Sequence, residues 1–494
     1  MNSISRDGTT FWFLAILVLA FLLRVYDLSG ESIWIDEGRS IDVARMSIPD
    51  LITENSLDNH PPLYSILLHY WMLLFGDSEF STRFLSVLFS VLSLLVLYQI
   101  ATTLFNQQIA RYSVLLMTVS VFHIQYAQEI KSYALMLLLI LLSYLFFIRL
   151  LRQRRIMDII LYIISCALLL YTHFLGVSTI LAQVICLLAT FYRETGSKFR
   201  QLIFWILIYL GILILFLPWL GFLCSRTLDL QQNFWVKNPD LFSLPQVLLI
   251  YSGTYTPFGI AVLLISLALI LLAVWPKKKT TELHPGSIAY PGLLLISWFL
   301  VPLLLPFIIS LFSASIFMAR ITIGSLPAFF LLITVGLFTL KKPAFIKLVK
   351  TIMVVLSLAN IIIYYHETNK ERWREAVQFV ESNAWPGDLV ILHEEYCLVN
   401  AFNYYAQRED LHKTGFPPPE KTITPQTIAG LKTIATGSDR VWLVLSHSHD
   451  RDNLIISHLQ EQFQLNMHQS YQSRGFNSHQ PYTGVDVYLF ERSP

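Results

Sequence analysis

The chain has 494 residues, of which 55% are hydrophobic and 14% are charged, and its formal net charge is +2. A composition this apolar excludes an ordinary soluble domain and predicts a protein that crosses a membrane several times. The near balance of charge gives no support for a nucleic-acid partner.

A spanning helix needs about 20 predominantly apolar residues. The candidate runs are 11–28, 81–104, 109–126, 132–151, 157–172, 174–192, 201–221, 257–275, 290–311, 319–340 and 345–365. No small-residue cleavage site follows the first run, so it is interpreted as a retained span rather than a signal peptide. A further stretch, 61–76, is shorter and carries His69, and whether it crosses the membrane decides the topology.

The basic residues decide between the two topologies, because cytoplasmic loops carry an excess of Lys and Arg. If 61–76 lies along the membrane interface, all the basic clusters fall on one side. They are Arg6; Arg111; Arg149, Arg152, Arg154 and Arg155; Arg193, Lys198 and Arg200; Lys277, Lys278 and Lys279; and Lys341, Lys342, Lys347 and Lys350. We therefore predict about eleven transmembrane helices, a cytoplasmic N-terminus and an extracytoplasmic C-terminus.

The composition becomes polar after Tyr365, which predicts a separate domain over 367–494 that follows a membrane domain over 1–366. Helix and strand patterns alternate there, as is typical of a small α/β domain. The predicted elements are helices at 371–383, 424–436 and 453–465 and strands at 388–392, 440–446 and 485–490. In the long outer loop 222–256 we predict a short interfacial helix.

Two adjacent carboxylates, Asp36 and Glu37, follow the first span in the segment WIDEG. A carboxylate just outside a membrane span suits a general base or a substrate-orienting group. The alternative is structural, because acidic residues also stabilise the N-terminus of a helix.

Further polar residues come at the predicted outer ends of other spans. They lie in Asn59–Tyr64, which includes His60, in Gln128–Tyr133, which includes Glu129 and Lys131, at His173, and at Arg320. Transfer of a sugar from a lipid phosphate needs a base for a hydroxyl proton and cations for the departing phosphate. Lys131 and Arg320 suit the second task.

Each of these residues also has a structural alternative. Lys131 can extend along the membrane surface from a span end, and Arg320 can pair with an acidic residue. His60 and His173 can be ordinary loop and turn residues, and Arg24 and Arg83 can be interfacial anchors. Both interpretations stay open at this point.

Cysteines and histidines give little indication of a disulfide or a metal site. Cys166 and Cys186 lie in apolar runs and are predicted core residues, whereas Cys224 and Cys397 could meet outside the membrane. In the C-terminal domain, 393–395 (HEE) and 447–450 (HSHD) have the residue types of metal ligands, but their spacing fits no zinc pattern. We predict no required cofactor, although a divalent metal is chemically possible beside the carboxylates.

The motifs WIDEG, NHPPLY, FGDSEFSTRFLS, QEIKSYAL, YTHF and FMARITIGSLPA occur in this order. Their order and spacing resemble bacterial GT-C membrane glycosyltransferases, in particular the protein O-mannosyltransferase and lipid A aminoarabinose transferase-like enzymes. The resemblance covers roughly 11–340, and WREAVQFVESNAWPGDLVIL resembles the start of the outer domain that many of them carry. It implies a GT-C fold, a polyprenyl-phosphate-linked sugar donor, an extracytoplasmic active site in the bacterial inner membrane, and inverting transfer.

The resemblance also implies roles for single residues. The acidic pair of the family's first loop falls on Asp36 and Glu37, with the Asp as general base. A basic residue of the QEIKSYAL segment falls on Lys131, where many relatives carry Arg, and an Arg-Tyr pair falls on Arg320 and Ile321, so the Tyr is missing. The complete set that we predict is Asp36 and Glu37 for catalysis; Lys131, Arg320, Arg24 and Arg83 for the donor phosphate; and His60, Tyr64, Glu129, Tyr133 and His173 for substrate.

Two other functions are weighed against a transferase that acts on a lipid, glycan or protein acceptor. A lipid-linked sugar flippase would need ionisable groups at mid-membrane and repeated halves, and the sequence shows no such repeat. A non-catalytic assembly subunit would use the outer domain to bind a partner.

Overall fold

A computed structural model describes residues 4–57, 60–193, 198–226, 236–275, 291–393, 395–417, 423–446, 448, 450, 453–473 and 484–492. The chain forms two compact units. The membrane unit comprises Met1–Tyr26, Met46–Gly76 and Ser81–Ile363. The α/β unit comprises Asp27–Arg45, Asp77–Phe80 and Tyr364–Pro494. The predicted boundary at 366 is therefore incomplete, because two segments of the predicted membrane domain pack with the C-terminal domain.

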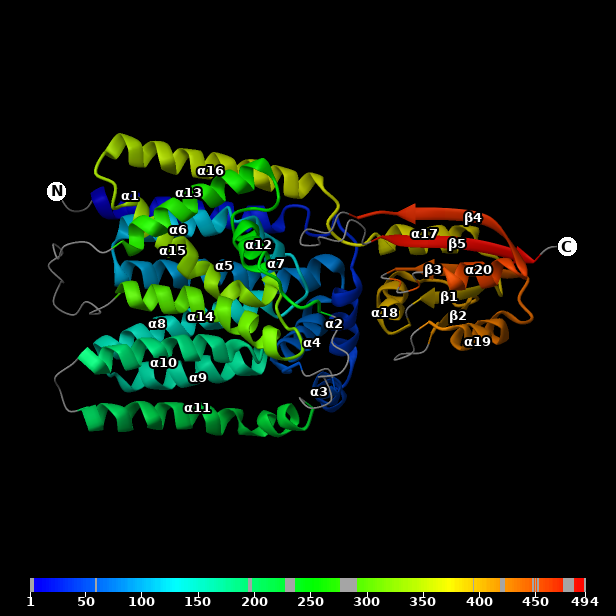
Figure 1. Ribbon diagram of the computed structural model, residues 1–494, viewed down its shortest axis with the longest axis horizontal. Helices are drawn as coiled ribbons and strands as arrows, with labels where there is room; N and C mark the ends of the chain where they lie inside the picture. The colour runs from blue at the N-terminus through cyan, green and yellow to red at the C-terminus, as the bar shows by residue number, and fades with distance from the viewer. Residues whose placement is uncertain are drawn as a thin grey trace. The chain divides into compact units, whose positions relative to one another are not determined.

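The membrane unit is a bundle of apolar helices that lie side by side (Figure 1). Among the described residues, seven helical stretches have the length and composition of a membrane span. They are α5 (Glu79–Leu104), α8 (Tyr133–Arg152), α11 (Lys198–Arg226), α13 (Pro257–Val274), α14 (Pro291–Phe312), η2 (Ala319–Ser325) with α15 (Leu326–Leu337), and α16 (Pro343–His366). Shorter apolar stretches form α1 (Ile4–Val25), α4 (Leu63–Phe75), α9 (Ile156–Thr172) and α10 (Gly176–Arg193).

The prediction of one continuous helix over 109–126 is wrong. The segment forms α6 (Gln107–Thr118) and α7 (Val121–Ala127), and the Ser120 side chain between them accepts a hydrogen bond from the backbone N–H of His123. A break of this kind leaves carbonyl groups of the first helix without intrahelical partners. The Arg24 guanidinium donates to the carbonyl oxygens of Thr118 (3.4 Å) and Met117 (3.5 Å). The break is therefore stabilised by a side chain from another helix.

Besides α6 and α7, three further helices in the described part of the membrane unit are too short to span a membrane. At 1.5 Å per residue, α4 with its 13 residues extends only about 20 Å, which is shorter than a hydrocarbon layer of about 30 Å. The other two are α3 (Ile48–Leu57) and α12 (Ser243–Tyr251). The short helix predicted within 222–256 is thus present as α12.

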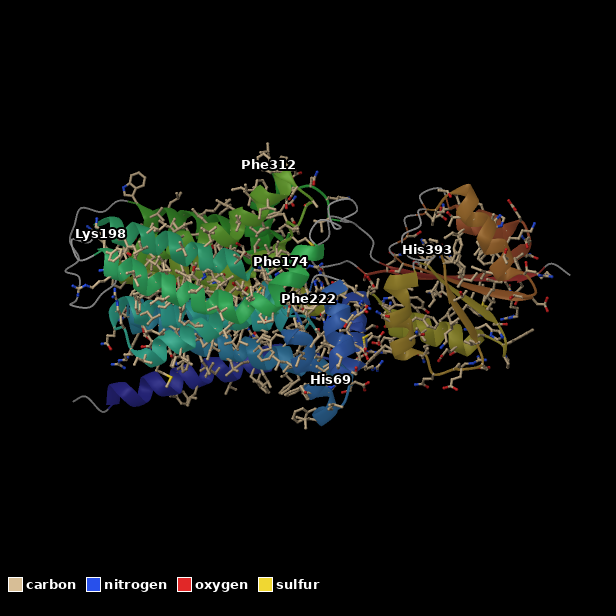
Figure 2. All side chains as sticks on the ribbon, turned by 90° about the horizontal axis from the view of Figure 1, so that it is seen from below. His69, Phe174, Lys198, Phe222, Phe312 and His393 are labelled. Carbon is tan, nitrogen blue, oxygen red and sulfur yellow. The ribbon has the colours of Figure 1, made fainter. Side chains whose placement is uncertain are left out.

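Basic side chains from several helices gather at one end of this bundle. Arg149 lies 3.7 Å from Asp158 of the next helix, and Arg154 lies over the ring of Phe204 at 4.6 Å. Lys350 approaches the rings of Tyr112 and Phe338 at 5.3 and 4.3 Å, Arg111 lies over Trp12, and Arg152 donates to the carbonyl of Thr103. We call this the basic end of the membrane unit. Lys198 lies toward one end of the bundle in Figure 2, and Phe174 and Phe222 lie toward the other.

The α/β unit contains a five-stranded sheet with the order β2-β1-β3-β5-β4. Its strands are β1 (Leu389–His393), β2 (His412–Gly415), β3 (Arg440–Leu445), β4 (Phe463–Tyr471) and β5 (Val485–Arg492). β1 runs parallel to β2 and β3, and β5 runs antiparallel to β3 and β4. Buried alternate residues of β1 and β3 face two separate cores.

Helices cover both faces of this sheet (Figure 1). On one face, α17 (Trp373–Asn383) and α18 (Glu395–Tyr405) pack Trp373 and Phe402 against Trp442. On the other face lie α19 (Pro425–Ala435) and α20 (Leu454–Gln460). The α/β class is thereby confirmed.

Several details of this domain differ from the prediction. Neither α18 nor β2 was predicted. The helix predicted to reach residue 465 is shorter, because α20 ends at Gln460 and β4 begins at Phe463. Both missed strands are at the edges of the sheet, and most residues of β4 are exposed. An edge strand with two exposed faces lacks the apolar alternation by which strands are recognised.

Candidate active site

Asp36 and Glu37 lie in the first turn of α2 (Ile35–Arg45), in the α/β unit. The backbone N–H groups of Glu37 and Gly38 donate to the carbonyl oxygen of Trp34 at 3.0 and 2.9 Å, which starts the helix. Negative charge is favourable at a helix N-terminus. Their position therefore agrees with the structural alternative, in which the two acidic residues stabilise the start of a helix.

The two adjacent carboxylates have different environments. Glu37 is fully buried, and its Oε1 lies 2.9 Å from Nζ of Lys370, whose side chain is only 10% exposed. Asp36 is half-buried, and its backbone carbonyl accepts a hydrogen bond from Ser40 Oγ at 2.9 Å. Of the two carboxylates, Asp36 is therefore the more accessible.

Close packing holds α2 against α18. A Cβ atom at Gly38 would lie 3.1 Å from the backbone nitrogen of Ala401 and 3.2 Å from the carbonyl carbon of Asn400. Such contacts leave no space for a larger residue. Glycine in the WIDEG segment therefore permits the two helices to approach.

In the membrane unit, Arg320 lies at the start of η2, and its guanidinium carbon is 5.9 Å from the ring centre of Tyr133. The Tyr133 ring is 6.2 Å from that of His173 and 5.1 Å from that of Tyr126. Three predicted residues from segments far apart in the sequence therefore lie together. The predicted span at 319–340 differs from expectation in starting as a 3-10 helix.

Neighbouring helices fix the backbone of η2. Trp298 of α14 donates from Nε1 to the carbonyl of Gly324 at 2.9 Å, and Tyr251 of α12 donates to Thr322 Oγ1 at 2.7 Å. Gly324 itself packs against Ile140, since an added Cβ would lie 2.9 Å from that side chain. Arg320 thus lies at the start of a short helix whose backbone is held by its neighbours.

His173 occupies the turn between α9 and α10. Burial, followed by the nearby His60 and Arg320, lowers the pKa of His173 to about 3. Its Nδ1 accepts a hydrogen bond from the backbone N–H of Leu175 at 3.2 Å, which agrees with a neutral ring. His60, which is itself exposed, lies close enough to His173 to contribute to this lowering of its pKa.

The segment 128–132 joins α7 to α8 and carries Glu129 and Lys131. Gln128 anchors it by donating from Nε2 to the carbonyl oxygens of Arg24 (3.1 Å) and Tyr26 (2.9 Å). Glu129 is buried, and Lys131 is half-buried. This anchorage places the predicted phosphate-binding lysine directly before the start of α8.

Arg24 has a structural environment that the sequence analysis did not predict. The side chain is fully buried and also contacts Ser90 Oγ at 2.8 Å, the carbonyl of Ala20 at 2.9 Å and Nδ1 of His123 at 2.6 Å. Protein acceptors thus surround its guanidinium group. The role of Arg24 in phosphate binding gains no support from these contacts.

Arg83 and Tyr64 are both buried in the membrane unit. Tyr64 OH lies 3.4 Å from Ser86 Oγ, so it links α4 to α5. Their predicted roles toward the donor and the substrate stay predictions.

Sequence reasoning missed Lys370 as the partner of Glu37. The two residues are 333 positions apart, and no sequence motif indicates that they pair. The proximity of Lys370 to the WREAV segment was the only available signal.

Within the described parts of the chain, no three His, Cys, Asp or Glu side chains are grouped to hold a metal ion. Glu394, His447 and His449 of the two C-terminal candidates lie outside the described residues, as do the side chains of Cys224 and Cys397. Cys166 and Cys186 are buried free thiols, as expected.

Comparison with known proteins identifies the fold. Residues 59–222 match the family model described as dolichyl-phosphate-mannose-protein mannosyltransferase. The structure of ArnT from Cupriavidus metallidurans bound to undecaprenyl phosphate is similar, with 12% identity, a TM-score of 0.58, and coverage of 97% of this chain and 98% of that one. The apo ArnT structure gives a TM-score of 0.60 at 12% identity and covers 98% of both chains.

An archaeal oligosaccharyltransferase, AglB from Archaeoglobus fulgidus, is also similar in structure. Its complex with an inhibitory peptide and a dolichol-phosphate gives 13% identity, a TM-score of 0.53, and coverage of 98% of this chain and 74% of that one. No curated protein matches by sequence. The resemblance inferred from the motifs is confirmed: the chain has the GT-C fold of membrane glycosyltransferases.

Proposed function

We propose that the protein is an inverting glycosyltransferase of the membrane, with a polyprenyl-phosphate-linked sugar as donor. The acceptor is a hydroxyl group of an extracytoplasmic lipid, glycan or protein. Asp36 acts as general base, and Lys131 and Arg320 bind the donor phosphate. The donor class is supported by the solved structures of the same fold, which contain undecaprenyl phosphate or dolichol-phosphate.

In the proposed step, the acceptor oxygen attacks the anomeric carbon from the face opposite the phosphate. The bond between the anomeric carbon and the phosphate oxygen breaks, and polyprenyl phosphate leaves with the bonding electrons. The hydroxyl proton passes to the Asp36 carboxylate. Fixed cations stabilise the developing phosphate charge, so the proposal requires no metal ion.

The observation that carries this proposal is the different burial of the two adjacent acidic residues. Glu37 is buried in an ion pair with Lys370, whereas Asp36, one residue earlier, is half-buried. A general base must be reachable by the proton that it accepts. The half-buried Asp36 satisfies this condition better than the fully buried Glu37 does.

The location of the phosphate-binding residues also supports the proposal. α8 runs from Tyr133 to Arg149 and Arg152 at the basic end, and its 20 residues extend about 30 Å. Tyr133, with Arg320 beside it, therefore lies at the end of the bundle away from the basic end. If the basic end faces the cytoplasm, these residues face the extracytoplasmic side.

The replacement Asp36→Asn tests the base assignment, because it preserves shape and removes the proton acceptor. We expect transfer to fall by about 100-fold or more, as is typical for loss of a general base. The matched control is Asp42→Asn on the same helix, whose carboxylate pairs with Arg45. The assay measures sugar transfer from radiolabelled donor lipids extracted from source membranes. Full activity of Asp36→Asn would reject the assignment, and donor translocation without transfer would favour a flippase.

A further inference from the structure

The segment that precedes α2 is bound to the C-terminal domain by several polar contacts. Glu31 accepts hydrogen bonds from the backbone N–H groups of Asn369 and of Lys370, the latter at 3.2 Å. Ser32 Oγ donates to Glu375 Oε2 at 3.2 Å. The backbone N–H of Ile33 donates to the hydroxyl of Tyr405 at 2.6 Å. The chain entering α2 is therefore held from both α17 and α18.

A second set of contacts uses the segment Asp77–Phe80. Glu79 accepts from the Tyr405 hydroxyl and forms an ion pair with Arg374. Arg374 also donates to the carbonyl of Ser29 at 2.9 Å. At the far end of α2, Arg45 pairs with Asp77 at 2.6 Å. One network thus connects both ends of α2 to the domain.

The buried pair of Glu37 and Lys370 lies at the centre of this network, one residue from Asp36. Removing Lys370 takes a close counter-charge away from the buried Glu37 carboxylate. Loss of one member of a buried ion pair is strongly destabilising, so we expect the surroundings of Glu37 to rearrange. Because Glu37 is in the first helical turn, such a rearrangement acts on the same turn that carries Asp36. Because Gly38 packs closely against Ala401 of α18, a shift of this turn also changes how α2 packs against α18.

We infer that Lys370 is a positioning residue: through its buried ion pair with Glu37, the C-terminal α/β domain holds the helix that presents Asp36. The inference rests on the proposed function in taking Asp36 as the base. It assigns the domain an indirect part in the chemical step, through the position of Asp36, in place of a purely partner-binding role.

The test compares Lys370→Met with Lys370→Arg in the full-length protein, in vesicles of phosphatidylethanolamine and phosphatidylglycerol. For Lys370→Met we expect kcat to fall at least about ten-fold, since a misplacement of about 1 Å can cost 100-fold. The apparent KM for the extracted donor lipids and the affinity for undecaprenyl phosphate should change less than about two-fold, because Lys131 and Arg320 belong to the membrane unit. Lys370→Arg should recover most of the rate.

The matched control is Arg440→Met. Arg440 is 11% exposed, close to the 10% of Lys370, and it pairs with Asp388 and Glu491 in the sheet. It should lower the Tm but leave kcat unchanged. Amide hydrogen exchange over 33–45 gives a readout independent of activity, and we expect it to accelerate in Lys370→Met but not in Arg440→Met.

Unchanged kcat and unchanged exchange in Lys370→Met would overturn the inference, and so would equal losses in Lys370→Met and Arg440→Met. If Lys370→Met does not fold, Lys370→Gln, which keeps a hydrogen-bond donor, is held to the same criteria. A fully active Asp36→Asn variant would reject the base assignment by itself, whereas an inactive Asp36→Asn beside a fully active Lys370→Met would reject only the positioning role.

Discussion

Asp36 and Glu37 show how adjacent acidic residues acquire different environments. Successive side chains on an α-helix are rotated by about 100°, so two neighbours cannot face the same surface. Glu37 faces Lys370 in the interior of the α/β unit, and Asp36 is half-buried. The environment of each carboxylate therefore follows from the direction in which the helix points it.

At the same scale, Arg320 should contribute directly to donor binding. A hydrogen bond to a charged group contributes about 1.5–3 kcal/mol, so Arg320→Ala should weaken undecaprenyl phosphate binding by roughly ten-fold or more. Arg320→Lys should have an intermediate effect, because it keeps the charge and loses the planar fork. Affinity is measured with purified protein in nanodiscs. The control is Lys237→Ala, which removes an exposed cation. Unchanged affinity in both Arg320→Ala and Lys131→Ala would reject their role.

The low pKa of His173, about 3, makes a prediction for acid stability. Between pH 6.5 and 3 the unfolded histidine is protonated and the folded one is not, so its contribution to stability is lost as the pH falls through 6.5. At pH 5 this destabilises the wild type by about 1 kcal/mol, allowing for the partial exposure of the ring. His173→Gln should therefore lose less Tm between pH 7.5 and pH 5 than the wild type. An identical Tm loss in both proteins would contradict the assigned ionisation state.

At the scale of elements, the break between α6 and α7 depends on a residue from α1. Arg24 donates to carbonyl groups of Met117 and Thr118 and contacts His123 across the break. The same region anchors Gln128, and with it the segment that carries Lys131. Arg24 thus contacts both the break between α6 and α7 and, through Gln128, the segment that carries Lys131.

The replacement Arg24→Met should therefore destabilise the protein by about 2–3 kcal/mol, because it removes a buried donor to the Thr118 carbonyl, to Ser90 and to His123. The measurement is thermal unfolding in detergent. Arg154→Met is the control, since it removes a cation that lies over the Phe204 ring at the basic end. A normal Tm together with lost undecaprenyl phosphate binding would instead support the predicted role of Arg24 in binding the donor phosphate.

At the scale of the whole molecule, the distribution of basic residues predicts the orientation in the membrane. Arg111, Arg149, Arg152, Arg154 and Lys350 make their contacts at one end of the membrane unit. Clusters of Lys and Arg are retained on the cytoplasmic side. We expect this end to be cytoplasmic and the residues near Arg320 to be extracytoplasmic.

Cysteine labelling tests this orientation in a variant that lacks the four native cysteines. Lys237→Cys should react with a membrane-impermeant maleimide in intact spheroplasts, and Lys198→Cys should react only after permeabilisation. Both positions avoid the candidate active site. The opposite pattern would invert the predicted topology and place the site in the cytoplasm.

Much of the fold and part of the candidate site follow from local patterns. The apolar runs locate α5, α8 and α14 because a helix must satisfy its own backbone hydrogen bonds in lipid. The buried strands β1 and β3 are recognisable by their continuous apolar sequence. Arg320, Tyr133 and His173 were identified as candidates from their motifs, and the structure brings them together.

Local sequence patterns are enough to predict the membrane class, the approximate spans, the α/β class of the C-terminal domain and the residue types available for sugar transfer. Tertiary structure decided where α6 ends, which carboxylate of the acidic pair is buried, and that Lys370 is its partner. The physical reason is the distance along the sequence over which each feature is set. Apolar run length and periodicity are properties of about twenty consecutive residues. An ion pair between residues 333 positions apart depends on how the whole chain packs.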